Sequence, residues 1–65
     1  MKLSYFEDTD TLYIEFKQAE ISESKDLDEN TILELDKNND IIALTVEHAS
    51  SRTDIQNLTL NGIAA

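Results

Sequence analysis

The sequence predicts a small α+β domain, in which an antiparallel β-meander of four to five strands is followed by a short C-terminal helix or helical turn. Two observations support this prediction. Apolar Leu12, Ile14 and Phe16 alternate with Tyr13 and Glu15, which is typical of a strand with one buried face. The same alternation returns in later segments, and polar turn residues separate these segments.

The first half of the chain predicts a hairpin and then a weak edge strand. Lys2–Phe6 and Thr11–Lys17 alternate in polarity, and the turn formers of 7–10 join them. Gln18–Ser24 has only two apolar residues, so it predicts at most a short edge strand. Glu23–Asn30 is too polar to be buried, and we predict an exposed connection there.

The second half predicts another hairpin and a helical turn. Thr31–Asp36 and Ile41–Glu47 are apolar runs, and the turn 37–40 between them contains asparagines, which tolerate left-handed backbone. In the last strand Ile42, Leu44 and Val46 share one side, which is the predicted core face. The β pattern stops at His48, and Ala49–Arg52 suits a helical turn that leaves the sheet.

The tail after Arg52 leaves two interpretations open. Thr53–Gln56 has the spacing of a capping box, which predicts a helix that presents Ile55 and Leu58. Residues 58–60 also alternate, as a strand would. We therefore interpret residues 1–65 as one domain in which 53–65 form the less certain tail.

Composition and charge exclude several classes of protein. The 65 residues include no cysteine, so disulfides, thiolate metal sites and thiol nucleophiles are excluded, and packing or oligomerisation must supply the stability. A net charge of −9 disfavours nucleic acid and anionic membranes as direct ligands. No apolar run is long enough for a membrane span, so a soluble, cytoplasmic protein is expected.

No set of residues predicts a catalytic, cofactor-binding or metal-binding site. Asp36, Asn38 and Asp40 have the spacing of a calcium loop, but Ile41 stands where that loop requires glycine. His48 is the one histidine and has no cysteine or second histidine with which to share a metal. An enzyme or metal-dependent regulator that uses His48 and nearby carboxylates is kept as an alternative hypothesis.

In its order of motifs the chain resembles the domain of unknown function family 2283 (DUF2283) of bacteria and archaea. The resemblance covers about residues 2 to 52 and includes Asp10-Thr11-Leu12-Tyr13-Ile14, the two apolar runs with their turn, and Ala49-Ser50-Ser51-Arg52. Phe6, Asn39 and Thr45 depart from the family's usual Asp, Gly and Glu. The resemblance implies the meander-plus-helix architecture and no established activity. It also suggests an antitoxin-like role, because family members are often suspected of pairing with small toxin-like proteins.

Together these observations predict a non-catalytic, acidic protein-interaction domain, with a basic toxin-like protein as its partner. A structural homo-oligomer is the alternative, because the runs at 31–35 and 41–46 are apolar on both sides and a homodimer would cover them. The predicted partner-binding residues are the aromatic residue of the second strand and the carboxylates of the acidic stretch, namely Tyr13, Glu20, Glu23, Asp26, Asp28 and Glu29.

Overall fold

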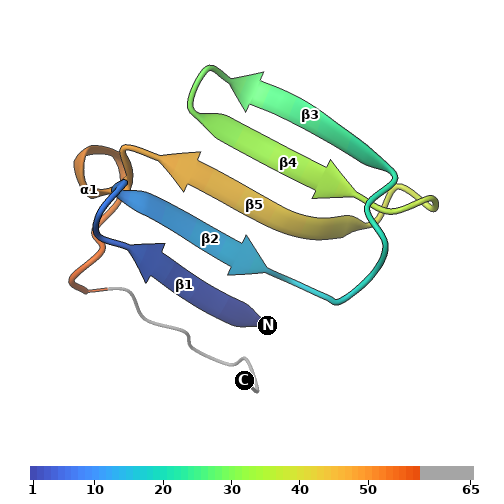
Figure 1. The fold of residues 1–65 in the computed structure, drawn as a ribbon, viewed down its shortest axis with the longest axis horizontal. Helices are drawn as coiled ribbons and strands as arrows, with labels where there is room; N and C mark the ends of the chain where they lie inside the picture. Colours follow the sequence, from blue (N-terminus) through green and yellow to red (C-terminus); the bar gives the residue numbers. More distant parts are fainter. Residues whose placement is uncertain (58–65) are drawn as a thin grey trace.

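The computed structural model of the protein describes residues 1–57 and contains one sheet and one short helix (Figure 1). The sheet is antiparallel and five-stranded, with strand order β1-β2-β5-β4-β3. The elements are β1 (Lys2–Phe6), β2 (Thr11–Glu15), β3 (Glu23–Asp28), β4 (Thr31–Leu35), β5 (Ile41–Glu47) and α1 (Ala49–Arg52). The predicted fold class, a small antiparallel sheet followed by a short helix, is confirmed.

The last strand, β5, lies in the middle of the sheet. It pairs with β2 on one side and with β4 on the other (Figure 1). The connection 16–22 carries the chain past the end of β5 to the far edge, where β3 and β4 form a hairpin. The most apolar strand therefore has neighbours on both sides, which explains why Ile42 and Ala43 are buried.

The third strand corrects two predictions. Glu23–Asp28 forms edge strand β3, although its polarity predicted an exposed connection, and the edge strand was expected at Gln18–Ser24. All six residues of β3 are indeed exposed. An edge strand is held by backbone hydrogen bonds to one neighbour and does not have to bury side chains, so polarity alone misses it.

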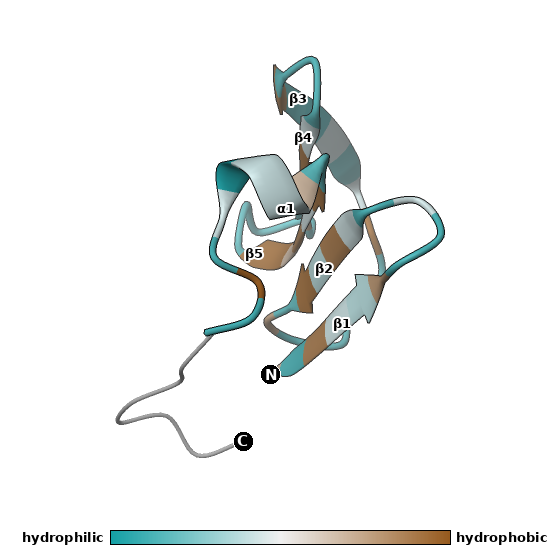
Figure 2. Ribbon diagram, turned by 90° about the vertical axis from the view of Figure 1, so that its left-hand side faces the viewer, coloured by the Kyte–Doolittle hydropathy of each residue, from teal (hydrophilic) through white to brown (hydrophobic). Residues whose placement is uncertain are grey.

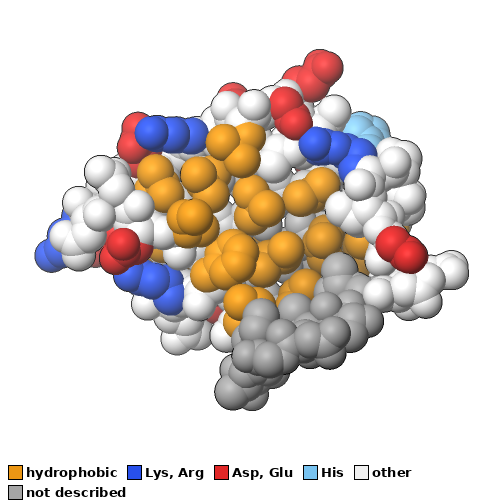
Figure 3. Space-filling view, turned by 180° about the vertical axis from the view of Figure 1, so that it is seen from behind, with side chains coloured by type: hydrophobic (Ala, Val, Ile, Leu, Met, Phe, Trp, Pro, Cys, Tyr) orange, Lys and Arg blue, Asp and Glu red, His pale blue; other side chains and the backbone are white. Residues whose placement is uncertain are grey.

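The core lies on one face of the sheet, which we call the core face. Leu12, Val46 and Ala49 form the buried cluster, against which Leu3, Ile14, Leu44 and Ile55 pack. Figure 3 shows this face as a broad group of hydrophobic side chains bordered by charged ones. Figure 2 places α1 on the same side of the sheet, where the helix covers one end of the core face.

The helix confirms one prediction and corrects another. Ala49–Arg52 is helical, as expected, but no helix begins at Thr53 within the described residues. Thr53 instead ends α1 in extended backbone, and both its N–H and its hydroxyl donate to the carbonyl of Ala49, each at 2.8 Å. The capping-box spacing was misleading because Thr53 caps the C-terminus of α1. Ile55 packs against the core without the helix that was expected to present it, and Leu58 lies outside the described residues.

Candidate functional site

The face opposite the core, which we call the outer face, carries Tyr13. Residues that are directly opposite in neighbouring strands share a face. The register therefore places one row of side chains straight across the sheet, and this row consists of Ser4, Tyr13, Thr45, Ile32 and Asp26. Tyr13 and Ile32 are half-buried, so the middle of the outer face is partly apolar.

Carboxylates surround this row. Glu15 and Glu34 pair with Ala43 from its two sides, which puts both on the outer face in the row next to Tyr13. Burial raises the pKa of the Tyr13 phenol, and the negative charges of Glu34 and Glu15 raise it further. Glu47, which pairs with Thr11, extends the same face beyond Thr45.

The six predicted partner-binding residues do not form one cluster. Tyr13 and Asp26 lie in the same row, three strand spacings or about 14 Å apart. Glu23 pairs with Leu35, and the alternation of β3 turns it away from the outer face. Glu20 lies in the connection 16–22, and Glu29 lies exposed in the turn between β3 and β4.

The sequence analysis missed the three glutamates Glu15, Glu34 and Glu47. Each stands two residues after a member of the Tyr13 row, and period two along a strand would have placed each on the face of that member. The predicted hairpin made β4 and β5 neighbours, but no local pattern indicated that β2 lies on the other side of β5.

A first cluster of polar contacts holds α1 against the β1–β2 hairpin. Asp10 has a left-handed backbone (φ 54°), and its carboxylate accepts hydrogen bonds from the Tyr5 hydroxyl, the Ser50 N–H at 3.1 Å and the Ser50 hydroxyl at 2.7 Å. The hydrogen bond from Tyr5 lowers the pKa of Asp10 most, and those from Ser50 lower it further. His48, the residue before α1, makes no side-chain cap, so Asp10 supplies the cap from forty residues away.

A second cluster holds α1 to the β3–β4 turn. Arg52 donates to the Thr31 hydroxyl at 2.6 Å and to the Asp28 carboxylate at 2.9 Å. The Asn30 N–H lowers the pKa of Asp28 most, and Thr31 and Arg52 add to the effect. Asp28, a predicted partner-binding residue, is therefore engaged within the fold.

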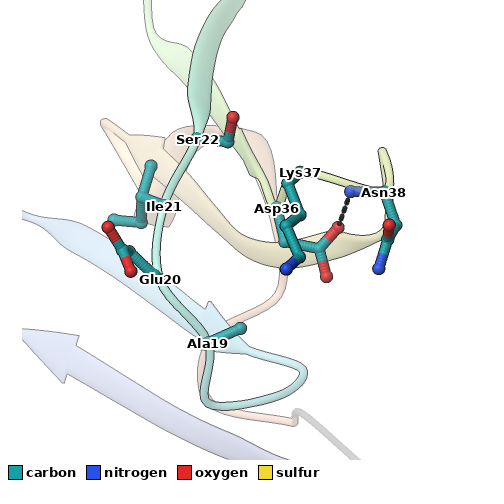
Figure 4. A pocket seen from close by; sticks show the side chains of 7 residues that line it. All are labelled: Ala19, Glu20, Ile21, Ser22, Asp36, Lys37 and Asn38. Atoms are coloured by element: carbon teal, nitrogen blue, oxygen red, sulfur yellow. Dashed lines mark hydrogen bonds between the residues drawn. The ribbon is translucent and has the colours of Figure 1, made fainter.

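A pocket of about 330 Å³ opens between the connection 16–22 and the β4–β5 turn (Figure 4). Its lining consists of Ala19, Glu20, Ile21, Ser22, Asp36, Lys37 and Asn38. The buried Asp36 carboxylate accepts from the backbone N–H groups of Asn38 (2.8 Å) and Asp40 (3.0 Å) and from Lys17 Nζ (2.5 Å). The turn whose spacing resembled a calcium loop is thus closed by the Asp36 carboxylate, which accepts from backbone N–H groups of the turn. The lining includes no histidine that could serve as a base for Ser22.

These contacts predict acid sensitivity at Asp36. The hydrogen bond from Lys17 is the largest cause that lowers the pKa of Asp36 and that raises the pKa of Lys17. A carboxyl whose pKa is lower in the folded state stabilises the fold above its ordinary pKa, and this contribution is lost as the pH falls. We expect Asp36→Asn to lower the urea midpoint at pH 7 and to reduce its fall between pH 5 and pH 3. Asp40→Asn is the matched control. It removes the same charge, from an exposed carboxylate that lies 3.6 Å from Lys17 Nζ. Equal pH profiles of the two variants would contradict this assignment.

His48, the residue on which the enzyme hypothesis depends, is exposed and directly precedes α1. Its backbone is left-handed (φ 55°), and its carbonyl accepts from the N–H and the hydroxyl of Ser51. The neighbouring Ser50 hydroxyl donates to Asp10.

Within residues 1–57, no group of three or more His, Asp or Glu side chains is placed to hold a metal ion. No helix in the same part of the chain is long and apolar enough to cross a membrane.

Comparisons with known proteins agree with the family resemblance. A search of curated proteins found no match, and a search of solved structures found none. The sequence model of a protein family of unknown function, DUF2283, matches residues 2–50. This match includes Asp10, the whole sheet and the first residues of α1. The chain therefore belongs to the DUF2283 family.

Proposed function

We propose that this protein is a non-catalytic protein-binding domain whose outer face binds a basic protein. The observation that carries the proposal is the row across the sheet, in which Tyr13 and Ile32 form a partly apolar centre with carboxylates on several sides. The acidic members of this binding face are Glu15, Glu34, Glu47 and Asp26.

The carboxylates of the described residues fall into two groups. Asp10, Asp28 and Asp36 accept hydrogen bonds that hold turns and α1 in place. The four carboxylates of the outer face make no ion pair and no side-chain hydrogen bond within residues 1–57. Charges that the fold does not use are available to a partner, whereas those that hold the fold are not.

This arrangement favours a partner with clustered lysine or arginine side chains. A half-buried tyrosine provides a rigid aromatic contact at low entropic cost, and aromatic residues often dominate the binding energy of interfaces. A net charge of −9 increases the encounter rate with a cationic protein and makes the affinity decrease with salt. An antitoxin-like role is the form of this function that the family resemblance suggests. The carboxylates would then occupy the phosphate-binding surface of a toxin-like nuclease.

Affinity capture with matched variants tests the proposal. The test variant Glu15→Gln/Glu34→Gln removes two charges beside Tyr13, and the control Glu23→Gln/Glu29→Gln removes two charges elsewhere. We expect the wild type and the control to retain the same basic protein from a cell extract. The test variant should lose it, with a decrease in affinity of about tenfold or more.

Measurements on the purified partner complete the test. Its affinity for the wild type should fall steeply between 50 mM and 300 mM salt, and Tyr13→Ala should weaken binding without changing the salt dependence. The proposal is wrong if the captured proteins are the same for both double variants, or if salt leaves the affinity unchanged.

A further inference from the structure

The two edges of the sheet differ in how well they are protected from pairing with another strand. At one edge, β3 is polar along its whole length and has a register irregularity between Asp26 and Asp28. Charged side chains and bulges are the usual protection of edge strands. At the other edge, β1 has the sequence Lys-Leu-Ser-Tyr-Phe and no register irregularity, and Phe6 is 53% exposed.

Charge also distinguishes β1 from the other strands. Lys2 is its only charged residue, so β1 is the one strand with a positive formal charge among the five that the structure describes. Two copies of a chain with net charge −9 repel each other, and this repulsion is weakest where neither copy presents carboxylates along its edge. The β1 edge therefore suits a second copy of this chain better than the β3 edge does.

The sequence of β1 is complementary to itself in one antiparallel register. When Ser4 of one copy lies opposite Ser4 of the other, Leu3 lies opposite Tyr5 and Lys2 lies opposite Phe6, twice each by symmetry. Leu3 and Tyr5 pair with Ile14 and Leu12, so these contacts extend the core faces of both copies. Lys2 and Phe6 meet on the outer face, where an ammonium can lie over an aromatic ring.

We propose that two copies of this chain associate through their β1 strands into one continuous ten-stranded sheet. A register shift by one residue would place the core face of one copy beside the outer face of the other, so the register centred on Ser4 is favoured. It uses all five residues of β1 and joins the Tyr13 rows of the two copies end to end. The dimer does not depend on the proposed basic partner, because it involves only this chain.

Single cysteines test the arrangement, because the chain has no cysteine of its own. In the proposed register the two Ser4 Cβ atoms lie about 5 Å apart, a distance that allows a disulfide after small adjustments. The matched control is Ser24→Cys, on the opposite edge strand β3. We expect Ser4→Cys to form a covalent dimer under mild oxidation at least tenfold faster than Ser24→Cys at the same micromolar concentration. Equal rates would overturn the proposal.

Substitutions at Lys2 and Phe6, which lie opposite each other in the proposed register, provide a second test. Phe6→Lys places two lysines opposite each other across the proposed interface, at a site whose side chain is exposed in the monomer. Sedimentation analysis should show a dimer for the wild type, a monomer for Phe6→Lys and a dimer again for Lys2→Glu/Phe6→Lys. A dimer that Phe6→Lys leaves intact, or a wild type that is monomeric at millimolar concentration, would refute the β1 interface. Either result would leave the test with the basic partner unaffected.

Discussion

Replacing Leu12 by alanine is expected to unfold most of the protein. Leu12 is 4% exposed and belongs to the buried cluster with Val46 and Ala49. Truncation of a buried leucine costs about 2–5 kcal/mol, since apolar burial is lost and a cavity remains. A domain of 65 residues without disulfides has a total stability of only about 3–5 kcal/mol. The variant should therefore lose the far-ultraviolet circular dichroism signal of its sheet at pH 7 and 25 °C, or unfold at a urea concentration near zero.

The control for this experiment is Leu27→Ala. Leu27 is a leucine of the same sheet, on edge strand β3, and it is 59% exposed. Its truncation should change the free energy of unfolding by less than about 0.5 kcal/mol. If both variants lost the same stability, the core would not lie where the structure places it.

Removal of the Asp10 carboxylate is expected to detach α1 from the hairpin. Asp10→Ala loses the acceptor for the Ser50 N–H, the Ser50 hydroxyl and the Tyr5 hydroxyl at once. It also puts alanine at a left-handed position that aspartate tolerates better. We expect the thermal midpoint to fall by several degrees or more, and amide exchange in α1 to accelerate beyond that in β5.

The matched control is Asp8→Ala, which removes the same charge from an exposed position in the same turn. Asp10→Asn should be intermediate, because its amide oxygen can still accept one of the hydrogen bonds. An Asp8→Ala variant as unstable as Asp10→Ala would show that the loss comes from the hairpin turn rather than from the cap of α1.

The pH profile of the Asp10 variants follows from the same contacts. The pKa of Asp10 is lowered chiefly by Tyr5, and the pKa of Tyr5 is raised chiefly by Asp10. The carboxylate therefore stabilises the fold above the ordinary aspartate pKa, and its contribution disappears as the pH falls through the acidic range. The Tyr5 hydroxyl contributes below the ordinary tyrosine pKa, and its contribution is lost as the pH rises through the alkaline range. The difference between the wild type and Asp10→Ala should be largest between these limits.

Much of the fold follows from local patterns, as β2 and β5 illustrate. Alternation in Thr11–Lys17 and Ile41–Glu47 indicated both strands, although β2 ends at Glu15. Leu12, Ile14, Leu44 and Val46 pack in the core cluster and Ile42 is buried, whereas Phe16 is 40% exposed. The edge strand β3 could not be found in this way, because its backbone pairing with β4 buries none of its side chains. The spacing at Thr53 predicted the start of a helix, but Thr53 ends α1 instead, because a threonine can cap either end of a helix.

The candidate binding face was likewise predicted only in part from the sequence. Tyr13 and Asp26 were predicted from composition and residue type, but Glu15, Glu34 and Glu47 were not. The acidic stretch was treated as one surface, whereas the fold uses Asp28 to hold Arg52 and leaves Asp26 exposed on β3. Whether a carboxylate is held by the fold or is available to a partner depends on which distant residues lie next to it.

The amino-acid sequence alone determined where four of the five strands begin, which side of β5 faces the core, and that the protein carries a strong negative charge. These properties depend on neighbours along the chain and on composition. Only the tertiary structure decided that β2 pairs with β5, that Asp10 caps α1, and that Tyr13 stands among carboxylates from three strands. Each of these depends on contacts between residues far apart in the chain, and strand pairing of this kind is specified by the whole set of packed side chains at once.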